Sequence, residues 1–357
     1  MTFAVRPAGF RSNTNGFTTP EPMNGTTAYS PMEGIAVNSA GLFVAVGWEG
    51  SGAPLYATST NGSTWTTPAL MNGSTALAQM YAVTVNSAGL FVAVGLDSSG
   101  APLYATSTNG SNWTTPARMN GSSAQAQMYA VTVNSAGLFV AVGYDNGSNS
   151  RPLYATSTDG SNWTTPARMN GSTTFARMLD VTVNSAGLFV AVGHNNIGAP
   201  LYATSTNGST WTTPALMNGS TALAFMYAIT VNSAGLFVAV GTSGSSAPVY
   251  ATSTNGSTWS TPALMNGSST IAYMDGITVN SAGLFVAVGS DINGAPLYAT
   301  STNGSNWTTP SFMNGLSSDR PMRAVTVNSG SLFVAVGSGS NTGGSTNVAV
   351  SAWAAFP

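Results

Sequence analysis

The chain has 357 residues but only 8 basic and 10 acidic side chains, so 5% of its residues are charged, against about a quarter in an ordinary globular protein. A nucleic-acid-binding face needs many basic groups to displace counterions from phosphate, and a net charge of -2 with so few basic groups excludes one. Intrinsic disorder is also excluded, because 43% of the residues are hydrophobic and disorder requires low hydrophobicity with high net charge. We therefore expect a folded chain without a nucleic-acid partner.

The sequence has no cysteine, and His194 is its single histidine. Zinc sites of the usual Cys/His kind, thiol nucleophiles and disulfides are therefore excluded, and we expect no metal and no cofactor. The apolar runs are far shorter than the roughly 20 residues that span a bilayer, so membrane insertion is not expected. The first residues contain no apolar stretch long enough for a signal peptide. We expect an extracellular or virion location, reached after removal of a leader or by another route such as lysis, rather than a cytoplasmic one.

An internal repeat dominates the sequence from about residue 32 onward. The string Leu-Phe-Val-Ala-Val-Gly occurs seven times at intervals of 48 or 50 residues, and self-similarity at such a period is typical of solenoids and propellers. The copies of this string begin at Leu42, Leu90, Leu138, Leu188, Leu236, Leu284 and Leu332.

Four segments of each repeat are predicted to be strands. In the second copy they are Met80–Asn86, Leu90–Gly95, Pro102–Thr108 and Trp113–Met119. Val, Thr, Tyr, Phe and Trp dominate these runs, and Asn-Gly and Asn-Ser-Ala-Gly turns separate them. No segment has the period of 3.6 that indicates a helix. The second segment is apolar on both alternating faces, as expected for a strand that is covered on each side.

A small sheet that is apolar on both faces must pack between copies of itself. Radial packing leaves no uncovered end, and β-propellers of this kind have four to eight blades of four strands. The repeat therefore predicts an all-β fold in which residues 1–357 form a single seven-bladed β-propeller with four antiparallel strands per blade.

The two ends of the chain predict how the ring closes. The last repeat has a third-segment run at Asn347–Ser351 but no fourth segment after it. The missing segment stands at the front as Phe17-Thr-Thr-Pro-Glu-Pro-Met-Asn-Gly25, preceded by a degenerate turn at Asn13–Gly16. We therefore expect residues 1–25 to supply the outermost strand of the seventh blade as an N-terminal latch.

The connection between the third and fourth segments carries a recognisable motif. It reads Ser59-Thr-Asn-Gly-Ser-Thr-Trp65 in the first repeat and recurs in six of the seven, ending at Trp65, Trp113, Trp163, Trp211, Trp259 and Trp307. This resembles the Asp-box or BNR hairpin of sialidase-like and lectin-like β-propellers, written S-x-D-x-G-x-x-W. The chain departs from it in a spacing to Trp that is one residue shorter and in Asn at five of six acidic positions, leaving only Asp159. The resemblance implies that the Ser and Asx side chains bond the turn backbone and that the Trp packs between blades.

Catalysis of the sialidase kind is not expected. The resemblance implies three arginines that grip a carboxylate, a Tyr-Glu nucleophile pair and an acidic acid/base. Arg118 and Arg168 occupy equivalent positions in the outer segment, and no compact set of three arginines remains. A glycosidase also needs two carboxylates about 5 to 10 Å apart, whereas the 10 carboxylates here lie mostly in loops that differ between copies. We therefore expect no enzyme, and a glycoside hydrolase is the least favoured function.

The repeats differ from one another mainly on one face of the predicted disc. The hairpins Asn-Ser-Ala-Gly and Ser-Thr-Asn-Gly-Ser barely vary, whereas the loops between the second and third segments and the crossovers to the next repeat differ freely. A recognition surface on a rigid scaffold shows such variation. Drift in loosely constrained loops is the alternative.

One aligned column of the first segments lies near the predicted channel mouth. Its members are Glu33, Tyr81, Tyr129, Leu179, Tyr227, Asp275 and Arg323. Ring closure brings Asp275, Arg323 and Glu33 together, with Asp319 and Arg320 in the adjoining crossover and with Tyr81 and Tyr129 in an aromatic sector. Carboxylates, an arginine and aromatic rings suit a glycan or another polar ligand. The alternative is an ion pair that only stabilises the closing seam.

Two further functions stay open beside recognition at the channel mouth. The first is a lectin-like module with equivalent pockets between blades, in which Trp65, Trp113, Trp163, Trp211, Trp259 and Trp307 would contact sugar and repetition would raise avidity. The second is a structural or receptor-facing protein of a virion, phage tail or capsid. The expected partner is accordingly a glycan, a cell-surface receptor or another virion or surface protein.

Overall fold

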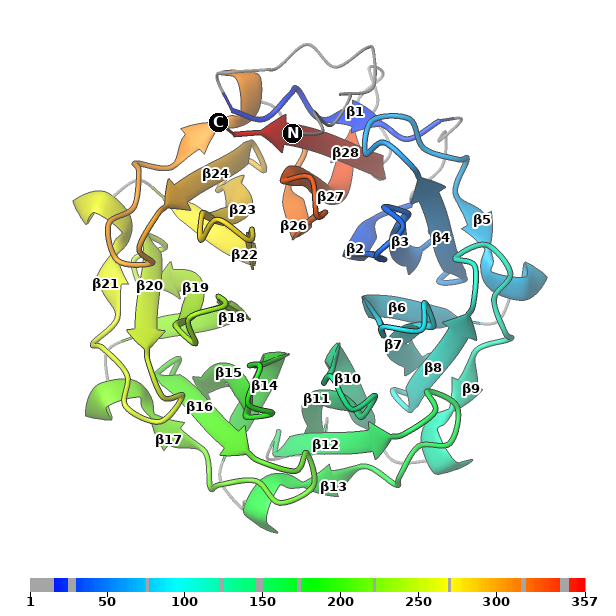
Figure 1. Cartoon of the computed structure of the whole chain (residues 1–357), viewed down its shortest axis with the longest axis horizontal. Helices are drawn as coiled ribbons and strands as arrows, with labels where there is room; N and C mark the ends of the chain where they lie inside the picture. Colours follow the sequence, from blue (N-terminus) through cyan, green and yellow to red (C-terminus); the bar gives the residue numbers. More distant parts are fainter. Residues whose placement is uncertain are drawn as a thin grey trace, which may run out of the picture.

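The computed structural model describes residues 16–24, 30–74, 77–121, 125–145, 150–171, 175–220, 223–268, 271–315, 319–340 and 347–356. These residues form seven four-stranded antiparallel sheets, which surround a central channel as blades (Figure 1). The predicted seven-bladed β-propeller is confirmed. Residues 1–15, which include most of the predicted turn at Asn13–Gly16, and Gly25 lie outside the described residues, and the assignment of all of residues 1–357 to one domain stays a prediction.

Each blade runs outward from the channel through four strands (Figure 1). The innermost strands are β2 (Met32–Val37), β6 (Ala78–Val85), β10 (Ala126–Val133), β14 (Ala176–Val183), β18 (Ala224–Val231), β22 (Ala272–Val279) and β26 (Met322–Val327). The second strands are β3 (Phe43–Trp48), β7 (Phe91–Asp97), β11 (Phe139–Asp145), β15 (Phe189–Asn195), β19 (Phe237–Ser243), β23 (Phe285–Asp291) and β27 (Leu332–Ser340). The third strands are β4 (Pro54–Ser59), β8 (Pro102–Ser107), β12 (Pro152–Ser157), β16 (Pro200–Ser205), β20 (Pro248–Ser253), β24 (Pro296–Ser301) and β28 (Asn347–Ala355).

The outermost strands are only two residues long. They are β5 (Ala69–Leu70), β9 (Ala117–Arg118), β13 (Ala167–Arg168), β17 (Ala215–Leu216), β21 (Ala263–Leu264), β25 (Ser311–Phe312) and, in blade seven, β1 (Glu21–Pro22). Short 3-10 turns follow six of them: η1 (Met71–Gly73), η2 (Met119–Gly121), η3 (Met169–Gly171), η4 (Met217–Gly219), η5 (Met265–Gly267) and η6 (Met313–Gly315).

The strand predicted over Trp113–Met119 is therefore wrong in its extent. Pro116 has no N–H to donate to a neighbouring strand, so regular pairing begins only after it. Ahead of the proline, the hydroxyl of Thr114 accepts the amide N–H of Thr106 at 2.9 Å, in the place of a backbone carbonyl. The outer segment is therefore joined to the third strand by a side-chain hydrogen bond and by a backbone ladder of only two residue pairs.

The hydrophobic core lies between neighbouring blades. In one seam, Val44 and Met71 from blade one pack with Met80, Phe91 and Trp113 from blade two. The other seams contain equivalent clusters. Each fully buried aromatic or aliphatic side chain of this kind contributes about 1.5–3 kcal/mol. The apolar character of the second strand on both faces is explained, because each face covers a different seam.

A β-bulge in each innermost strand explains the glycine that ends the repeated string. In blade two the register shifts between Met80 and Ala82, which leaves Tyr81 in the bulge. Opposite the bulge, a Cβ added to Gly95 would lie 1.9 Å from the carbonyl oxygen of Gln79, so only glycine fits there. Bulges re-aim side chains at sheet edges, and this one directs Tyr81 and its equivalents toward the channel.

The N-terminal latch closes the ring as predicted. Strand β1 pairs with β28, with Glu21 opposite Ser351. Phe17 takes the place of the repeated tryptophan, is 1% exposed, and meets the ring of Tyr298 edge-on at 5.4 Å. At the rim, the side-chain amide of Asn314 in blade six donates to the hydroxyl of Thr19 at 2.6 Å. Equivalent Asn-to-Thr bonds of 2.6–2.7 Å join five other seams, through Asn72–Thr115, Asn120–Thr165, Asn170–Thr213, Asn218–Thr261 and Asn266–Thr309.

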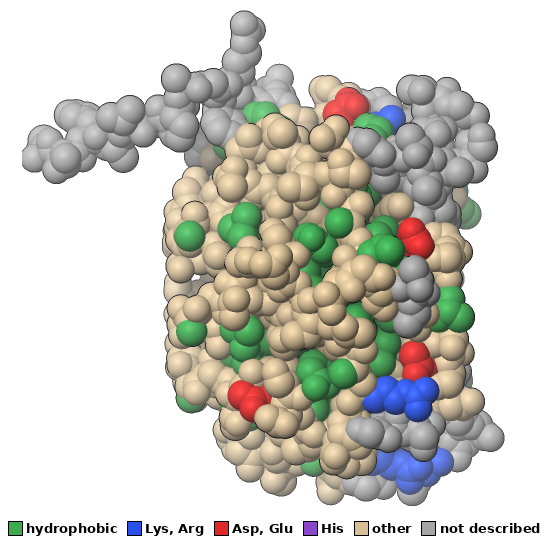
Figure 2. Space-filling model, turned by 90° about the vertical axis from the view of Figure 1, so that its right-hand side faces the viewer, with side chains coloured by type: hydrophobic (Ala, Val, Ile, Leu, Met, Phe, Trp, Pro, Cys, Tyr) green, Lys and Arg blue, Asp and Glu red, His purple; other side chains and the backbone are tan. Residues whose placement is uncertain are grey.

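The two faces of the disc differ in chemistry. The hairpins that join first to second and third to fourth strands lie on one face, which we call the hairpin face; the loops from second to third strands and the crossovers lie on the other, the loop face. In the side view the two faces lie to the left and to the right, and most of the visible charged side chains are toward the right-hand side (Figure 2). Within the described ranges no helix has the length and apolarity needed to cross a membrane.

Candidate functional site

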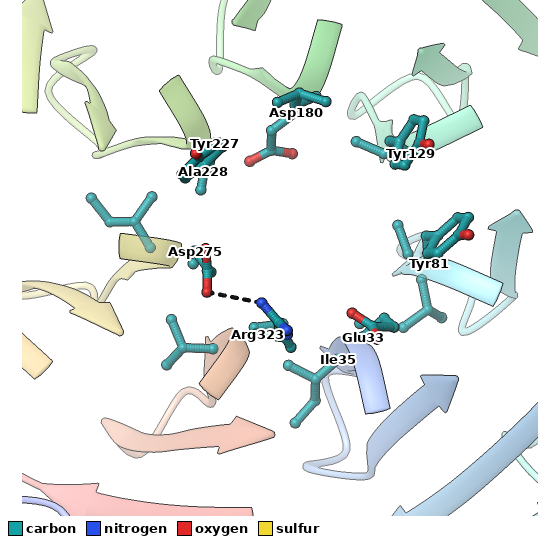
Figure 3. Close-up of a pocket in the computed structure, with 18 of the residues that line it drawn as sticks. Glu33, Ile35, Tyr81, Tyr129, Asp180, Tyr227, Ala228, Asp275 and Arg323 are labelled. Carbon is teal, nitrogen blue, oxygen red and sulfur yellow. Dashed lines mark hydrogen bonds and ion pairs between the residues drawn. The ribbon is translucent and has the colours of Figure 1, made fainter. Parts of the chain in front are cut away.

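The channel mouth is a cavity of about 200 Å³ lined by the innermost strands of all seven blades. Because each bulge turns one side chain into it, the aligned column is gathered there: Glu33, Tyr81, Tyr129, Leu179, Tyr227, Asp275 and Arg323. The close-up shows Asp275, Arg323 and Glu33 along one side of the cavity, Asp180 across from them, and Tyr81, Tyr129 and Tyr227 between these groups (Figure 3).

The charged sector comes from blades six, seven and one. The Arg323 guanidinium lies 3.3 Å from the Asp275 carboxylate, and it sits between Asp275 and Glu33 in the close-up (Figure 3). Burial raises the pKa of Asp275 to about 6, against the opposing attraction of Arg323. Burial likewise raises the pKa of Glu33, although Arg323 and the Trp48 side chain favour its ionised form. The carboxylates are therefore poorly solvated groups that a ligand hydroxyl can satisfy.

Arg320 does not join this sector. Its guanidinium donates to the backbone carbonyl of Pro20 and lies 4.0 Å from Glu21, so it contacts the N-terminal latch. Its crossover neighbour Asp319 lines the groove described next. Sequence alignment placed Arg320 in the right crossover, but the direction of a long side chain depends on the strand packed beside it.

A groove of about 730 Å³ extends the channel mouth across blade six. It shares Tyr227, Asp275 and Arg323 with the channel-mouth cavity and continues along Tyr273, Asp291, Ile292 and Asp319. A second groove of about 480 Å³ lies on the same face over blades one and two, where Trp48, Leu77, Gln79, Leu96 and Gln127 line it. The loop face thus has two depressions, and the one across blade six is continuous in its lining with the channel-mouth cavity.

The aromatic sector is a continuous stack of rings that extends beyond the two tyrosines of the aligned column. The rings of Tyr81 and Tyr129 stack at 5.1 Å, and Tyr144 continues the stack at 5.1 Å from Tyr129. The guanidinium of Arg177 covers the outer ring, 4.9 Å from the centre of Tyr144. Burial raises the pKa of Tyr81 to about 12, so its hydroxyl stays protonated. Sequence reasoning missed Tyr144 and Arg177, because they lie outside the aligned column.

Asp180 is a second residue that the sequence analysis missed. Its carboxylate accepts the amide N–H of Val181 at 2.8 Å and that of Ile229 in the next blade at 2.8 Å. Burial within the channel raises its pKa to about 7, against the effect of these two bonds. A signal was present in the repeat, since the equivalent positions hold only glycine or alanine: Gly34, Ala82, Ala130, Ala228, Gly276 and Ala324.

The six repeated tryptophans are part of the seams. Their exposure is between 3% and 5%, for Trp65, Trp113, Trp163, Trp211, Trp259 and Trp307. Each indole N–H donates to the glycine carbonyl of its own hairpin, as in Trp163 to Gly160 at 2.9 Å. A tyrosine of the preceding blade lies beside five of the six rings, as with Tyr104 and Trp163 at 6.3 Å. This arrangement accords with the packing role that the Asp-box resemblance implies, and none of the six lines the cavities described above.

The Asp-box-like hairpins keep the bonds that the resemblance implies. The Asp159 carboxylate accepts the amide N–H groups of Ser161 at 2.8 Å and Asn162 at 2.7 Å. Asn61 accepts the corresponding pair at 3.0 and 2.8 Å. Asn therefore replaces Asp with the same acceptor geometry but without the charge. Within the described part of the chain, no group of three or more His, Asp or Glu side chains could hold a metal ion.

Comparison with known proteins gives likeness of fold alone. No protein-family model and no curated protein matches the sequence. Among solved structures, the lectin BP39L from Burkholderia pseudomallei is similar with a TM-score of 0.71 and 14% identity, over 92% of this chain and 96% of the lectin. YCF48 bound to a D1 peptide is similar with a TM-score of 0.64 and 13% identity over 99% of both chains. A PL25 polysaccharide lyase, an ulvan lyase, has a TM-score of 0.55 and 9% identity, over 88% of this chain and 92% of the lyase.

Proposed function

We propose that this protein is a non-catalytic carbohydrate-binding propeller whose site is the channel mouth with its adjoining groove. One observation carries the proposal. The Asp275–Arg323 ion pair and Glu33 face tyrosines across a cavity of about 200 Å³, and that cavity opens into a groove of about 730 Å³. Ligand sites are typically concave, with a few converging polar groups beside aromatic side chains.

The chemistry of the lining favours a neutral glycan. A sugar hydroxyl both donates and accepts, so it can donate to Asp275 or Glu33 while it accepts from Arg323. Tyr227 and Tyr273 line the groove and offer ring surface to the C–H groups of a pyranose. Three carboxylates, those of Asp275, Asp291 and Asp319, stand against one guanidinium in the groove. An anionic glycan would therefore meet net repulsion.

The rim arginines support a non-catalytic role. Arg118 lies 2.5 Å from Asp97 and Arg168 lies 3.4 Å from Asp145, both at outermost strands. They are thus engaged far from the channel and do not supply the arginine cluster of a sialidase-like site. The similar solved structures include a lectin and a polysaccharide lyase, so the test below includes a search for cleavage.

The test is a calorimetric titration with the neutral oligosaccharides that the protein retains on a glycan array. The double variant Asp275→Asn/Arg323→Gln removes both charges without changing the net charge. We expect at least ten-fold weaker binding, because a lost charge-assisted hydrogen bond costs about 1.5–3 kcal/mol. The matched control, Asp97→Asn/Arg118→Gln, removes an ion pair that lies beside the second groove, outside the proposed site, and should bind as the wild type does.

Three results would overturn the proposal. Equal weakening by the channel-mouth variant and the rim control would remove the channel mouth from the site. Absence of binding to every glycan would favour a structural or receptor-facing role in a virion, which stays a prediction. Release of shorter saccharides from a polysaccharide during the titration would show an enzyme.

A further inference from the structure

One position of blade seven departs from the other six blades and lies in a cavity. Trp353 in β28 stands opposite Val334, as Thr58 in β4 stands opposite Val44. All six other blades carry threonine there: Thr58, Thr106, Thr156, Thr204, Thr252 and Thr300. The backbone is unchanged, since the Trp353 N–H donates to the hydroxyl of Thr18 at 3.1 Å and the Thr58 N–H donates to that of Thr66 at 2.9 Å. Trp353 therefore keeps the backbone hydrogen bond of its equivalents and differs from them in carrying an indole in place of a hydroxyl group.

The indole of Trp353 is half-buried. Part of it packs against the apolar cluster of the closing seam, which includes Met23, Phe43 and Val334. It also lines a cavity of about 360 Å³, together with Thr18, Thr19, Glu21, Ser63, Asn314 and Ser351. Four parts of the chain meet there: the N-terminal latch, the hairpin of blade one, the turn after blade six and β28. We call this cavity the seam pocket.

We propose that the seam pocket binds a neutral pyranose, with one C–H face of the sugar stacked on Trp353. The pocket combines one flat aromatic surface with hydroxyl groups of Thr18, Ser63 and Ser351. The Thr18 hydroxyl accepts the Trp353 N–H and can still donate, and the Ser63 hydroxyl donates to Asn61 and can still accept. Its size falls within the range of small-ligand pockets. A galactose-type ring presents such a face, because its axial O4 points away from the side that carries H3 and H5.

Charge does not favour an ionic ligand in the seam pocket. Glu21 is the only ionisable group among its described lining residues, and the Arg320 guanidinium lies 4.0 Å from it. The pair contributes no net charge, and the Glu21 carboxylate remains able to accept a sugar hydroxyl. This site shares no lining residue with the channel mouth, so the inference does not depend on the proposed function.

Binding in the seam pocket should be linked to closure of the ring. Thr18, Thr19 and Glu21 reach the pocket only when β1 is paired with β28. A ligand that binds only the closed ring stabilises it by mass action. The sugar should therefore raise the melting temperature in proportion to the logarithm of its concentration once that concentration exceeds the Kd.

The test uses methyl β-galactoside as the probe and Trp353→Thr as the variant. Threonine restores the residue of the other six blades, so the variant should fold as the wild type does. In saturation-transfer NMR we expect transfer to H3, H4 and H5 of the probe with the wild type and at least a ten-fold loss with the variant. The probe should also raise the melting temperature of the wild type but not that of Trp353→Thr. Asp275→Asn/Arg323→Gln is the control and should behave as the wild type.

Two results would overturn the inference: absence of transfer and of any melting shift in the wild type, or equal transfer with Trp353→Thr. Loss of transfer in the channel-mouth control instead would assign the probe to that site and also reject the seam pocket. If Trp353→Thr melts at a different temperature without the probe, Glu21→Gln provides the second variant. Glu21 is exposed, so its replacement should leave the fold intact and weaken binding of the probe. Unchanged binding by Glu21→Gln would count against the seam pocket.

Discussion

The turns on both faces of the disc are closed by a side chain that accepts hydrogen bonds from the backbone of its own turn. The turn sequences, however, are uniform on the hairpin face and variable on the loop face. On the hairpin face, the side chain of Asn38 accepts the N–H groups of Ala40 and Leu42 at 3.1 and 2.9 Å. On the loop face, the Asp97 carboxylate accepts those of Ser99 and Ala101 at 2.8 and 3.0 Å. Side chains that bond their own turn are common to both faces. Turn chemistry alone therefore does not explain why the hairpins are uniform and the loops are not.

The difference lies in what each face covers. The hairpins between third and fourth strands pack against the preceding blade, and a Cβ added to Gly110 would lie 2.7 Å from the Val44 side chain. The same glycine-to-valine contact recurs at Gly62, Gly160, Gly208, Gly256 and Gly304. The loops instead line the two grooves of the loop face, where one blade can differ from the next without disturbing a seam. This contrast favours recognition on the loop face over drift, and three changes to the chain would test it.

The largest expected effect comes from deleting residues 1–25, because both faces depend on a closed ring. The deletion removes the buried side chains of Phe17 and Met23, and one large-to-small change at such a site costs about 2–5 kcal/mol. We expect a loss of more than about 5 kcal/mol in the free energy of unfolding, measured by urea denaturation. Glycan binding should fail as well, since the latch completes blade seven, whose innermost strand β26 lies between β22 and β2 at the channel mouth.

A matched control for this deletion is Phe17→Trp, which places the residue of the six other blades in the latch. It should change stability by less than about 1.5 kcal/mol, as expected of a hydrophobic exchange that keeps the contact. An unchanged urea midpoint in the truncated chain would show that the latch does not hold the ring.

A smaller effect is expected from Asp180→Asn, which tests the channel below the loop face. The pKa of Asp180 is raised from 3.8 to about 7 by burial, so the folded state keeps a proton that the unfolded chain releases. Stability should therefore fall as the pH rises from about 4 to about 7, with a slope of up to about 1.4 kcal/mol per pH unit for this group. The variant cannot titrate and should lose this part of the slope in urea denaturation at a series of pH values.

Asp275→Asn serves as the comparison for Asp180→Asn. The pKa of Asp275 is raised to about 6, so its removal should flatten the profile only up to about that pH. Identical slopes in the wild type and in Asp180→Asn would contradict the burial of the Asp180 carboxylate in the channel.

The smallest effect is expected on the hairpin face, from Asp159→Asn. Hydrogen bonds from the backbone and side chain of Asn162 and from the backbone of Ser161 hold the pKa of Asp159 well below its ordinary value. The stabilisation is therefore present above the ordinary pKa and is lost as the pH falls. Because the group is exposed, the variant should lose less than about 1 kcal/mol at neutral pH and nothing at low pH, measured by urea denaturation. The converse change Asn109→Asp should gain a similar amount; a loss there would contradict the role of charge in the turn.

The architecture could be predicted from the amino-acid sequence alone. Seven copies of one apolar string fixed the number of blades, and the displaced Phe17-Thr-Thr-Pro segment showed which end of the chain completes the last blade. These features are readable because they are local patterns repeated at a constant period. The same alignment put Glu33, Asp275 and Arg323 in one column, and the bulges brought that column to the channel mouth.

The side chains that complete each candidate site could be identified only once the fold was known. The carboxylate of Asp180 reaches the N–H of Ile229 in the next blade, Arg320 turns to the carbonyl of Pro20, and Trp353 lies in a pocket with Ser63 and Asn314. Each of these contacts joins residues that are far apart in the chain. Repeat periodicity specifies the backbone frame, whereas the direction of a single side chain depends on the neighbouring blade against which it packs.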